Sequence, residues 1–155
     1  MNNLYESQFY DFSYRAIVDT ESKVKFFTDK DFIKVDYDLS FDLEDNHKTA
    51  VNYLLTSILS NVLITLIQRA KISKIELFDV EGKINAQLNN PLTLLGVHGY
   101  NKAPFIKECQ IIIYIGSEME QEDLIAFCHS ALKYCVVYNS LKDAIKFKLN
   151  FVAIF

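Results

Sequence analysis

The sequence has few of the residues that interrupt regular structure. It contains 4 glycines, 2 prolines and no tryptophan in 155 residues, while 12 phenylalanines and 9 tyrosines supply the aromatic side chains. Half of the residues are apolar, which is typical of a folded globular chain and excludes a disordered one. A chain of this length fits one domain with a sizeable core. We therefore predict a single domain over residues 1–155.

Basic charge and cysteine are also scarce. The chain has 16 Lys and Arg residues against 20 Asp and Glu, a net charge of −4, so it lacks the basic excess that a nucleic-acid partner requires. Its 3 cysteines have no regular spacing and do not form a disulfide framework. The opening MNNLYESQFYDF is not a basic segment followed by an apolar one, so we expect no secretory signal. These features predict the reducing cytoplasm.

Patterns for metals and phosphates are absent as well. His47, His98 and His129 lie in separate regions, and the sequence has neither an HExxH nor a CxxC motif. The glycines of LLGVHG are not followed by the Lys-Ser/Thr pair of a phosphate-binding loop. We predict no metal and no cofactor.

One long uncharged stretch, residues 50–68 (AVNYLLTSILSNVLITLIQ), approaches the length of a membrane span. Its Asn, Ser and Thr side chains are too many for a lone span in lipid. A helix that is apolar on most faces is also what the centre of a soluble fold requires. We predict a buried helix over residues 48–71, in a soluble protein without a membrane partner.

Period-two alternation predicts strands around this helix. Residues 9–18 and 32–40 alternate apolar and polar side chains, and residues 23–27 follow a polar break as a hairpin partner. Three antiparallel strands are therefore expected to open the chain. After the helix, strands are expected over residues 74–88 and 105–116, the second of them central because it becomes continuously apolar. The segment between them, with both prolines, is expected to be a long loop.

The last part of the chain predicts a second helix and a final strand. Ser117 with Glu120 matches a capping box, and the helix is expected to run to about Cys135, before a short turn at YNSLKDA and a strand over residues 144–155. The resulting order, βββ-α-ββ-α-β, predicts an α+β fold in which helices cover a sheet.

The cysteines leave two interpretations open. Cys109 lies in a predicted strand and is expected to be structural. Cys128 and Cys135 are seven residues apart, so they are expected on one helix face, where a buried small apolar side chain is the default. Cys135 also precedes a possible helix start, and the positive end of a helix dipole promotes the thiolate form. Cys135 is thus either a reactive thiol or a core residue.

Three stretches resemble the OsmC/Ohr family, the osmotically induced and organic-hydroperoxide-resistance proteins. They are similar to the family's central helix with its next strand, its long loop with the return strand, and the end of its second helix with the last strand: TSILSNVLITLIQRAKISKIELFDVEGKI, GVHGYNKAPFIKECQIII and LKYCVVYNSLKDAIKFKLNF. The resemblance covers about residues 10–155. It implies two central helices packed on antiparallel sheets, in an intertwined homodimer.

The resemblance also implies a chemistry, of which this chain keeps only part. In the family's peroxidases, a thiolate on the first central helix attacks the peroxide, and a second cysteine forms a disulfide with the resulting sulfenic acid. Cys135 matches the second, resolving cysteine, although Val136 replaces the usual proline. The first position falls on Asn61, which cannot be a redox nucleophile.

The groups that hold the first thiolate in the family are also not matched. The family's glutamate falls near Val51, and its arginine has no convincing counterpart, because Arg15 and Lys23 are candidates only by their location in the first hairpin. The resemblance therefore supports the fold more strongly than it supports the peroxidase chemistry.

We expect an OsmC-like protein that has lost the two-cysteine peroxidase mechanism and retains a cleft for a small apolar ligand at the dimer interface. Asn61, Ser60 and Cys135 are expected to line this pocket, with Asn61 supplying the polar contact. The alternative is a thiol-dependent organic hydroperoxide reductase of oxidative stress defence, which uses Cys135 and an external thiol. A third possibility is a stress-linked structural dimer without a small-molecule site.

Overall fold

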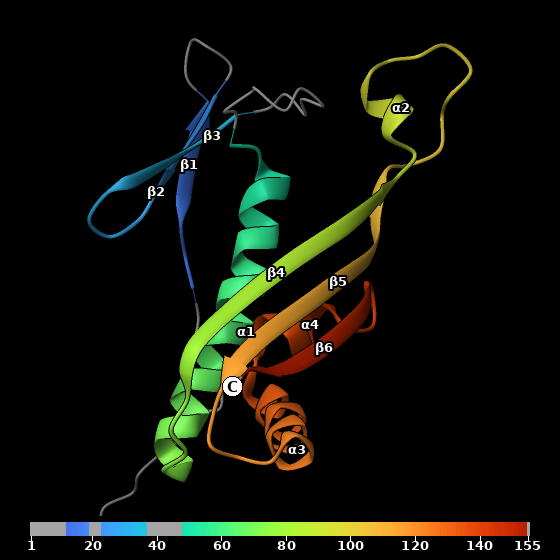
Figure 1. Ribbon diagram of the computed structural model, residues 1–155. Coiled ribbons are helices and arrows are strands. Elements are labelled where there is room, and N and C mark those ends of the chain that lie inside the picture. The colour runs from blue at the N-terminus through green and yellow to red at the C-terminus, as the bar shows by residue number, and fades with distance from the viewer. Residues whose placement is uncertain (1–11, 19–22, 37–47, 155) are drawn as a thin grey trace, which may run out of the picture. The chain divides into compact units, whose positions relative to one another are not determined.

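The computed structural model describes residues 12–18, 23–36 and 48–154 (Figure 1). The chain divides into two compact units, Met1–Ala50 and Val51–Phe155, and each is described by itself. The predicted single domain stays a prediction. In chain order, the elements are β1 (Arg15–Val18), β2 (Val24–Phe27), β3 (Phe32–Val35), α1 (Ala50–Ser73), β4 (Phe78–Asn89), α2 (Pro91–Leu94), β5 (Phe105–Gly116), α3 (Gln121–Ala131), the 3-10 turn η1 (Leu132–Tyr134), α4 (Val136–Leu141) and β6 (Lys146–Ile154).

The N-terminal unit contains an antiparallel sheet in the order β1-β2-β3, as predicted. Strand register places apolar side chains together on one face: Ala16, Val18, Val24, Phe26, Ile33 and Val35. The other face carries Arg15, whose guanidinium carbon lies 5.6 Å from the centre of the Phe27 ring. The ends of the predicted strands, residues 9–11, 19 and 37–40, lie outside the described residues.

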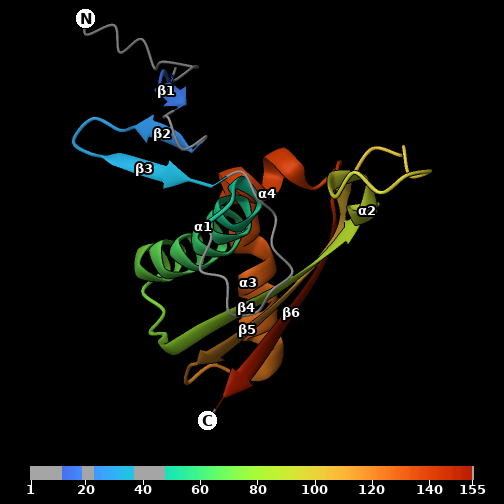
Figure 2. The ribbon, with the colours of Figure 1, turned by 90° about the horizontal axis from the view of Figure 1, so that it is seen from above.

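The C-terminal unit contains a mixed sheet in the order β4-β5-β6 (Figure 2). Strand β5 is central, as predicted, and its side chains Ile111, Ile113 and Ile115 are fully buried. The expected all-antiparallel arrangement is wrong for β6, which pairs parallel to β5. The physical reason is the crossover through α3 and α4, because such a connection returns the chain to the sheet in the same direction.

Helix α1 forms within two residues of its predicted bounds. It ends at Ser73. The next residue, Lys74, has a left-handed φ of 57°, and the Ile75 N–H donates to the Ala70 carbonyl at 2.9 Å. This is the backbone pattern of a Schellman cap. By length and composition alone, the helix is long and apolar enough to cross a membrane.

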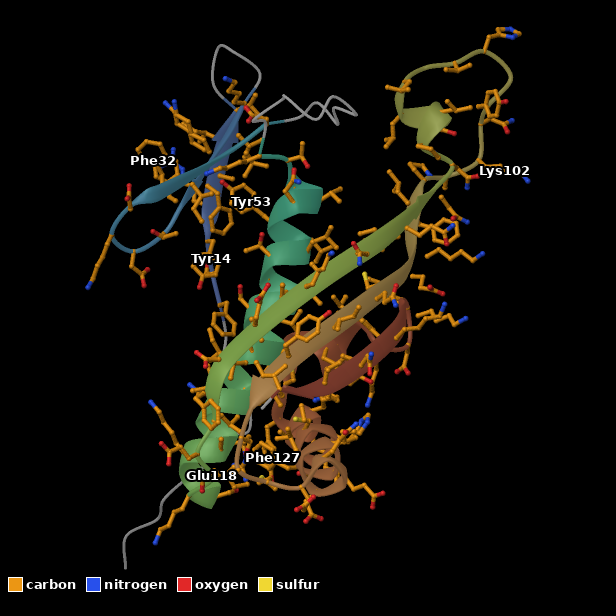
Figure 3. All side chains as sticks on the ribbon, viewed as in Figure 1. Tyr14, Phe32, Tyr53, Lys102, Glu118 and Phe127 are labelled. Carbon is orange, nitrogen blue, oxygen red and sulfur yellow. The ribbon has the colours of Figure 1, made fainter. Side chains whose placement is uncertain are left out.

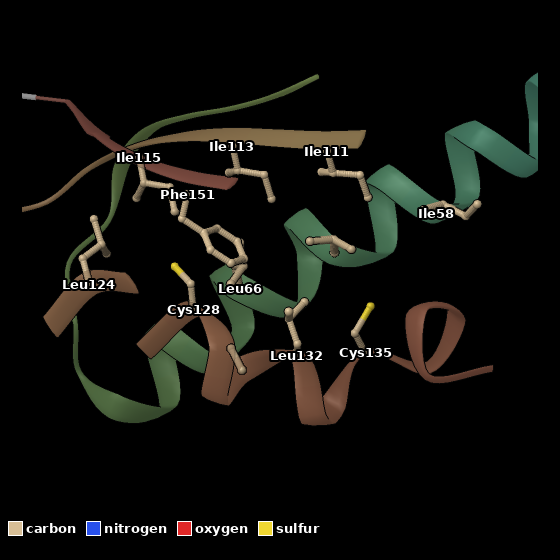
Figure 4. Close-up of a cluster of buried hydrophobic side chains, with 12 residues drawn as sticks. Ile58, Leu66, Ile111, Ile113, Ile115, Leu124, Cys128, Leu132, Cys135 and Phe151 are labelled. Atoms are coloured by element: carbon tan, nitrogen blue, oxygen red, sulfur yellow. The ribbon is translucent and has the colours of Figure 1, made fainter. Parts of the chain in front are cut away.

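The predicted burial of α1 holds for one face only. That face packs against β5 and α3 in the core of the C-terminal unit (Figure 4), through Ile58, Val62 and Leu66. Gly82 of β4 permits a close approach, because a Cβ atom there would lie 2.8 Å from Leu59 Cδ1. On the opposite face, Ile64 is 51% exposed.

Three local predictions are wrong. Helix α3 begins after Glu120, which makes no side-chain capping bond, and Ser117 accepts the Met119 N–H at 3.2 Å in a turn before the helix. Serine hydroxyls form such local turns as readily as they cap helices, so the motif alone does not distinguish the two. The predicted strand at residue 74 begins only at Phe78, and the expected long loop contains the short helix α2.

Candidate functional site at Asn61 and Cys135

Cys135 lies at an interruption between two helices and not inside one. Helix α3 ends at Ala131, and after η1 the backbone of Cys135 is extended, with φ −85° and ψ 103°. Cys135 is therefore the N-cap residue of α4, which begins at Val136, earlier than the predicted turn at YNSLKDA. Its side chain is fully buried. The expectation that Cys128 and Cys135 share one continuous helix face is wrong, because α3 ends between them.

Asn61 of α1 meets Cys135 through its amide oxygen. The Cys135 thiol donates to Asn61 Oδ1 at 3.2 Å, and the backbone N–H of Val137 donates to the same oxygen at 3.0 Å. A backbone N–H can only donate, so the atom that faces Val137 must be the amide oxygen. The sulfur that faces this oxygen must donate as well. In this contact the Cys135 thiol is therefore the hydrogen-bond donor.

The same contact caps α4 from another part of the chain. Val137 is the second residue of α4, and its N–H is one of the donors that a helix start leaves without an internal partner. The side chain of Cys135 makes no capping bond. Asn61, one of the best capping residue types, supplies the missing acceptor although it lies 76 positions away in the sequence.

The amide nitrogen of Asn61 remains available. Asn61 is half-buried, and apart from the backbone bonds within α1 its one other hydrogen bond in the described chain is from Thr65 Oγ1 to its backbone oxygen, at 2.6 Å. In the part that the structure describes, no buried side-chain nitrogen or oxygen lacks a partner. Because Asn61 Nδ2 has no protein partner there, it must reach the surface of its unit, with both N–H donors free.

The other two thiols are enclosed by apolar side chains. Cys109 and Cys128 are fully buried, and all three cysteines are free. Burial raises the pKa of Cys109, and it raises the pKa of Cys128 from 9.0 to about 12, because a thiolate is poorly solvated in an apolar core. Figure 4 shows the sulfur atoms of Cys128 and Cys135 at separate points of the core.

Other residues considered from the sequence are not brought to this contact. Ser60 is half-buried beside Asn61 on α1, and no hydrogen bond within the described residues joins it to Cys135. Arg15 and Lys23 belong to the N-terminal unit, where Lys23 Nζ lies 3.7 Å from a carboxylate oxygen of Asp36. Across the described ranges, no cationic side chain forms a hydrogen bond with the Cys135 sulfur.

One neighbouring contact was not expected from the sequence. The Arg69 guanidinium carbon lies 3.8 Å from the centre of the Tyr134 ring, a close cation–π geometry. Tyr134 directly precedes Cys135, and Arg69 lies two helical turns after Asn61. The pair therefore forms a second link between α1 and the segment that carries Cys135. No local pattern signals such a contact, because its partners are far apart in the sequence.

Two surface hollows lie elsewhere. One, of about 660 Å³, runs along the start of α3, where the side chains are mostly acidic: Glu120, Gln121, Glu122, Asp123 and Ile125 line it. The other, of about 300 Å³, lies in the arm between β4 and β5 that carries Lys102 (Figure 3). Neither hollow includes Asn61, Ser60 or Cys135.

The C-terminal unit thus packs α1 and α3 on a mixed sheet. A thiol–amide contact joins α1 to the segment that follows α3. This arrangement defines an α+β protein whose candidate site lies between helices. The sequence profile of the OsmC-like proteins matches residues 43–150. The chain belongs to this family. A comparison with curated protein sequences gave no match.

Solved structures show the same fold over most of the chain. An OsmC-like protein from Mycoplasma pneumoniae has a TM-score of 0.75 and 15% identity, covering 94% of this chain and 99% of that one. An organic hydroperoxide resistance protein from Elizabethkingia anophelis has a TM-score of 0.72 and 11% identity, covering 94% and 99%. A putative organic hydroperoxide resistance protein from Vibrio cholerae, with captopril bound in one of its active sites, has a TM-score of 0.64 and 10% identity, covering 94% and 95%.

These identities establish the fold alone. The α+β fold that the sequence predicts is confirmed, and the chain is related to the organic hydroperoxide resistance proteins.

Proposed function

We propose that this OsmC-like protein has lost the two-cysteine peroxidase mechanism and binds a small, mostly apolar molecule at Asn61, Ser60 and Cys135. The observation that carries the proposal is the 3.2 Å hydrogen bond from the Cys135 thiol to Asn61 Oδ1. In the family's cycle, Cys135 would resolve a sulfenic acid on the opposite helix. An amide occupies that place, and an amide forms neither a sulfenic acid nor a disulfide.

The surroundings of Asn61 support binding. Exposed apolar side chains lie on the two elements that Asn61 joins: Ile64 is 51% exposed one turn further along α1, and Val136 is 70% exposed at the start of α4. A few polar groups within an apolar surface are typical of small-molecule sites. The Vibrio cholerae relative, which holds captopril in one of its active sites, supports the use of this fold for small molecules.

The proposal includes a homodimer with the ligand cleft at its interface. The outer face of α1 exposes Ile64 and Ile67, at 51% and 39%. The N-terminal sheet, considered alone, also has one wholly apolar face. Exposed apolar surface of this kind is typical of an association surface. The free thiols suit the reducing cytoplasm, where we place the protein.

The alternative function is hydroperoxide reduction by Cys135. Its thiolate would attack the peroxide oxygen and release the alcohol, and an external thiol would then reduce the sulfenic acid. Two observations disfavour it: the Cys135 side chain is fully buried, and its thiol donates to an oxygen that would repel a thiolate. The purely structural dimer differs from our proposal only in binding no small molecule.

Peroxide consumption tests the proposed loss of activity. Wild-type protein and Cys135→Ser are incubated with tert-butyl hydroperoxide and excess dithiothreitol, and the remaining peroxide is measured. We expect both to match the protein-free rate. Wild-type turnover that Cys135→Ser abolishes would establish the reductase instead. Circular dichroism of both proteins confirms that each is folded.

A further inference from the structure

We infer that the site selects neutral carbonyl compounds, such as alkyl ketones or aldehydes, and discriminates against ligands whose polar group can only donate a hydrogen bond. This inference rests on the proposed function, because it names the ligand class of the same site. It follows from the hydrogen bonds that Asn61 has already made and from those it still has to offer.

The acceptor capacity of the Asn61 side chain is used up. An amide oxygen has two lone pairs, and an amide nitrogen has two N–H donors. Cys135 and Val137 donate to the oxygen at 3.2 and 3.0 Å, which leaves no lone pair for a ligand. The Cys135 proton is engaged in the same contact. Asn61 can therefore offer a ligand only N–H donors, and these require an acceptor.

The charge of the surroundings selects a neutral acceptor. A carboxylate that loses water needs a cation or several strong donors. Within the described chain, no cationic side chain forms a hydrogen bond or ion pair with Asn61 or Cys135. The nearby Arg69 guanidinium stacks on Tyr134 at 3.8 Å. A carbonyl oxygen accepts the Asn61 N–H groups without that desolvation cost.

The apolar surroundings select the rest of the molecule. Ile64 follows Asn61 by three residues, so both lie on the same side of α1, and Val136 precedes the residue whose N–H Asn61 accepts. Both apolar side chains are more than half exposed. Together they offer hydrocarbon surface on both of the elements that Asn61 joins, which suits an alkyl chain attached to a carbonyl group.

Asn61→Asp isolates the donor role. A carboxylate keeps an oxygen for the Val137 N–H and the Cys135 thiol, and a negative charge is favourable at a helix start. It has no N–H to offer. Ser57→Ala is the matched control, because Ser57 is exposed one turn earlier on α1 and its loss leaves the Asn61 amide intact.

The experiment compares 2-heptanone, heptylamine and heptane, which share a seven-carbon chain and differ in their polar group. Binding is followed by NMR through the Asn61 side-chain amide and the Ile64 and Val136 methyl resonances. For the wild type at neutral pH we expect 2-heptanone to shift the Asn61 amide and to bind about tenfold more tightly than heptylamine, whose ammonium form can only donate hydrogen bonds and is costly to desolvate. Asn61→Asp should lose this preference, and Ser57→Ala should keep it.

Three further outcomes separate this inference from the function on which it rests. If all three compounds shift the Ile64 and Val136 methyls with equal affinity, the apolar site stands and the carbonyl selectivity is overturned. A preference for heptylamine also overturns it. If none of the three binds, the proposed binding function fails, and the selectivity fails with it.

Discussion

The side chains of Asn61 and Cys135 form a hydrogen-bonded pair between α1 and the start of α4. The Val137 N–H decides the orientation of the amide, and the amide in turn decides that the sulfur is the donor. Any change at Asn61 therefore acts on the thiol and on the helix start together.

Asn61→Cys is expected to permit a disulfide with Cys135 without any other change. The sulfur of Cys135 lies 3.2 Å from the amide oxygen, and a thiol at Asn61 would approach it from the same direction, close enough for a disulfide after small side-chain rotations. Intact mass spectrometry after mild peroxide should show the loss of two hydrogens and a bond between the introduced thiol and Cys135. Asn61→Ser should show neither. A folded Asn61→Cys variant that stays reduced would contradict the geometry.

Cys128 is expected to make stability fall at alkaline pH. Burial raises its pKa from 9.0 to about 12, so between these values the unfolded chain loses a proton that the folded chain retains. The stabilisation is complete below pH 9.0 and is lost as the pH rises toward 12. Urea unfolding across this window should show a declining free energy of unfolding.

Cys128→Ala is the comparison for this effect. It lowers stability at every pH because it leaves a cavity, and it should make the alkaline decline shallower. Parallel curves for the two proteins would show that Cys128 does not contribute.

At the scale of elements, the interruption between α3 and α4 positions the site. A continuous helix would carry Cys135 along the axis of α3, whereas η1 and the extended backbone of Cys135 redirect the chain. The start of α4 then faces Asn61. The segment is secured twice, by the Asn61 contact and by the stack of Arg69 on Tyr134.

Proline substitutions at the first two positions of α4 are expected to act in opposite directions. Val136 is the first helical residue, where proline is well tolerated, and the extended Cys135 suits a following proline. Val136→Pro should be neutral or stabilise by about 0.4–1 kcal/mol. Val137→Pro removes the N–H that Asn61 accepts and should cost about 1–3 kcal/mol. Chemical denaturation measures both, and equal effects would contradict the capping role of Asn61.

At the scale of the whole molecule, large apolar side chains on the outer face of α1 remain exposed in one copy of the chain. The helix is as apolar as a buried element, yet only 22% of the residues in its most apolar stretch are buried. A second copy of the chain offers a way to cover the rest, and the proposed homodimer follows from this imbalance.

Ile64→Lys is expected to weaken the dimer. A lysine there would place a charge in the apolar interface, where its desolvation is not compensated. Gln68→Lys, one turn further along α1 and also exposed, is the control and should have a smaller effect. Light scattering with size-exclusion chromatography should show a dimer for the wild type and the control, and more monomer for Ile64→Lys. A monomeric wild type would refute the homodimer.

Local periodicity is enough to place most elements of this chain. The alternation in β3 and the apolar run in β5 are visible in the sequence, and α1 lies within two residues of its predicted bounds. These signals are local, because strands and helices repeat every two and 3.6 residues. The direction of β6 and the end of α3 depend on connections between elements, so sequence patterns alone misplace them.

Sequence patterns alone indicate an α+β protein that resembles the OsmC/Ohr family, and they predict that Asn61 stands where that family's peroxidases have a cysteine. Only the tertiary structure decided that Asn61 meets Cys135, since the contact spans 74 positions. It also decided that the Asn61 oxygen is occupied by two donors while its nitrogen is free. The sequence specifies the chemistry of each side chain, whereas the packing of distant elements determines which partners it contacts.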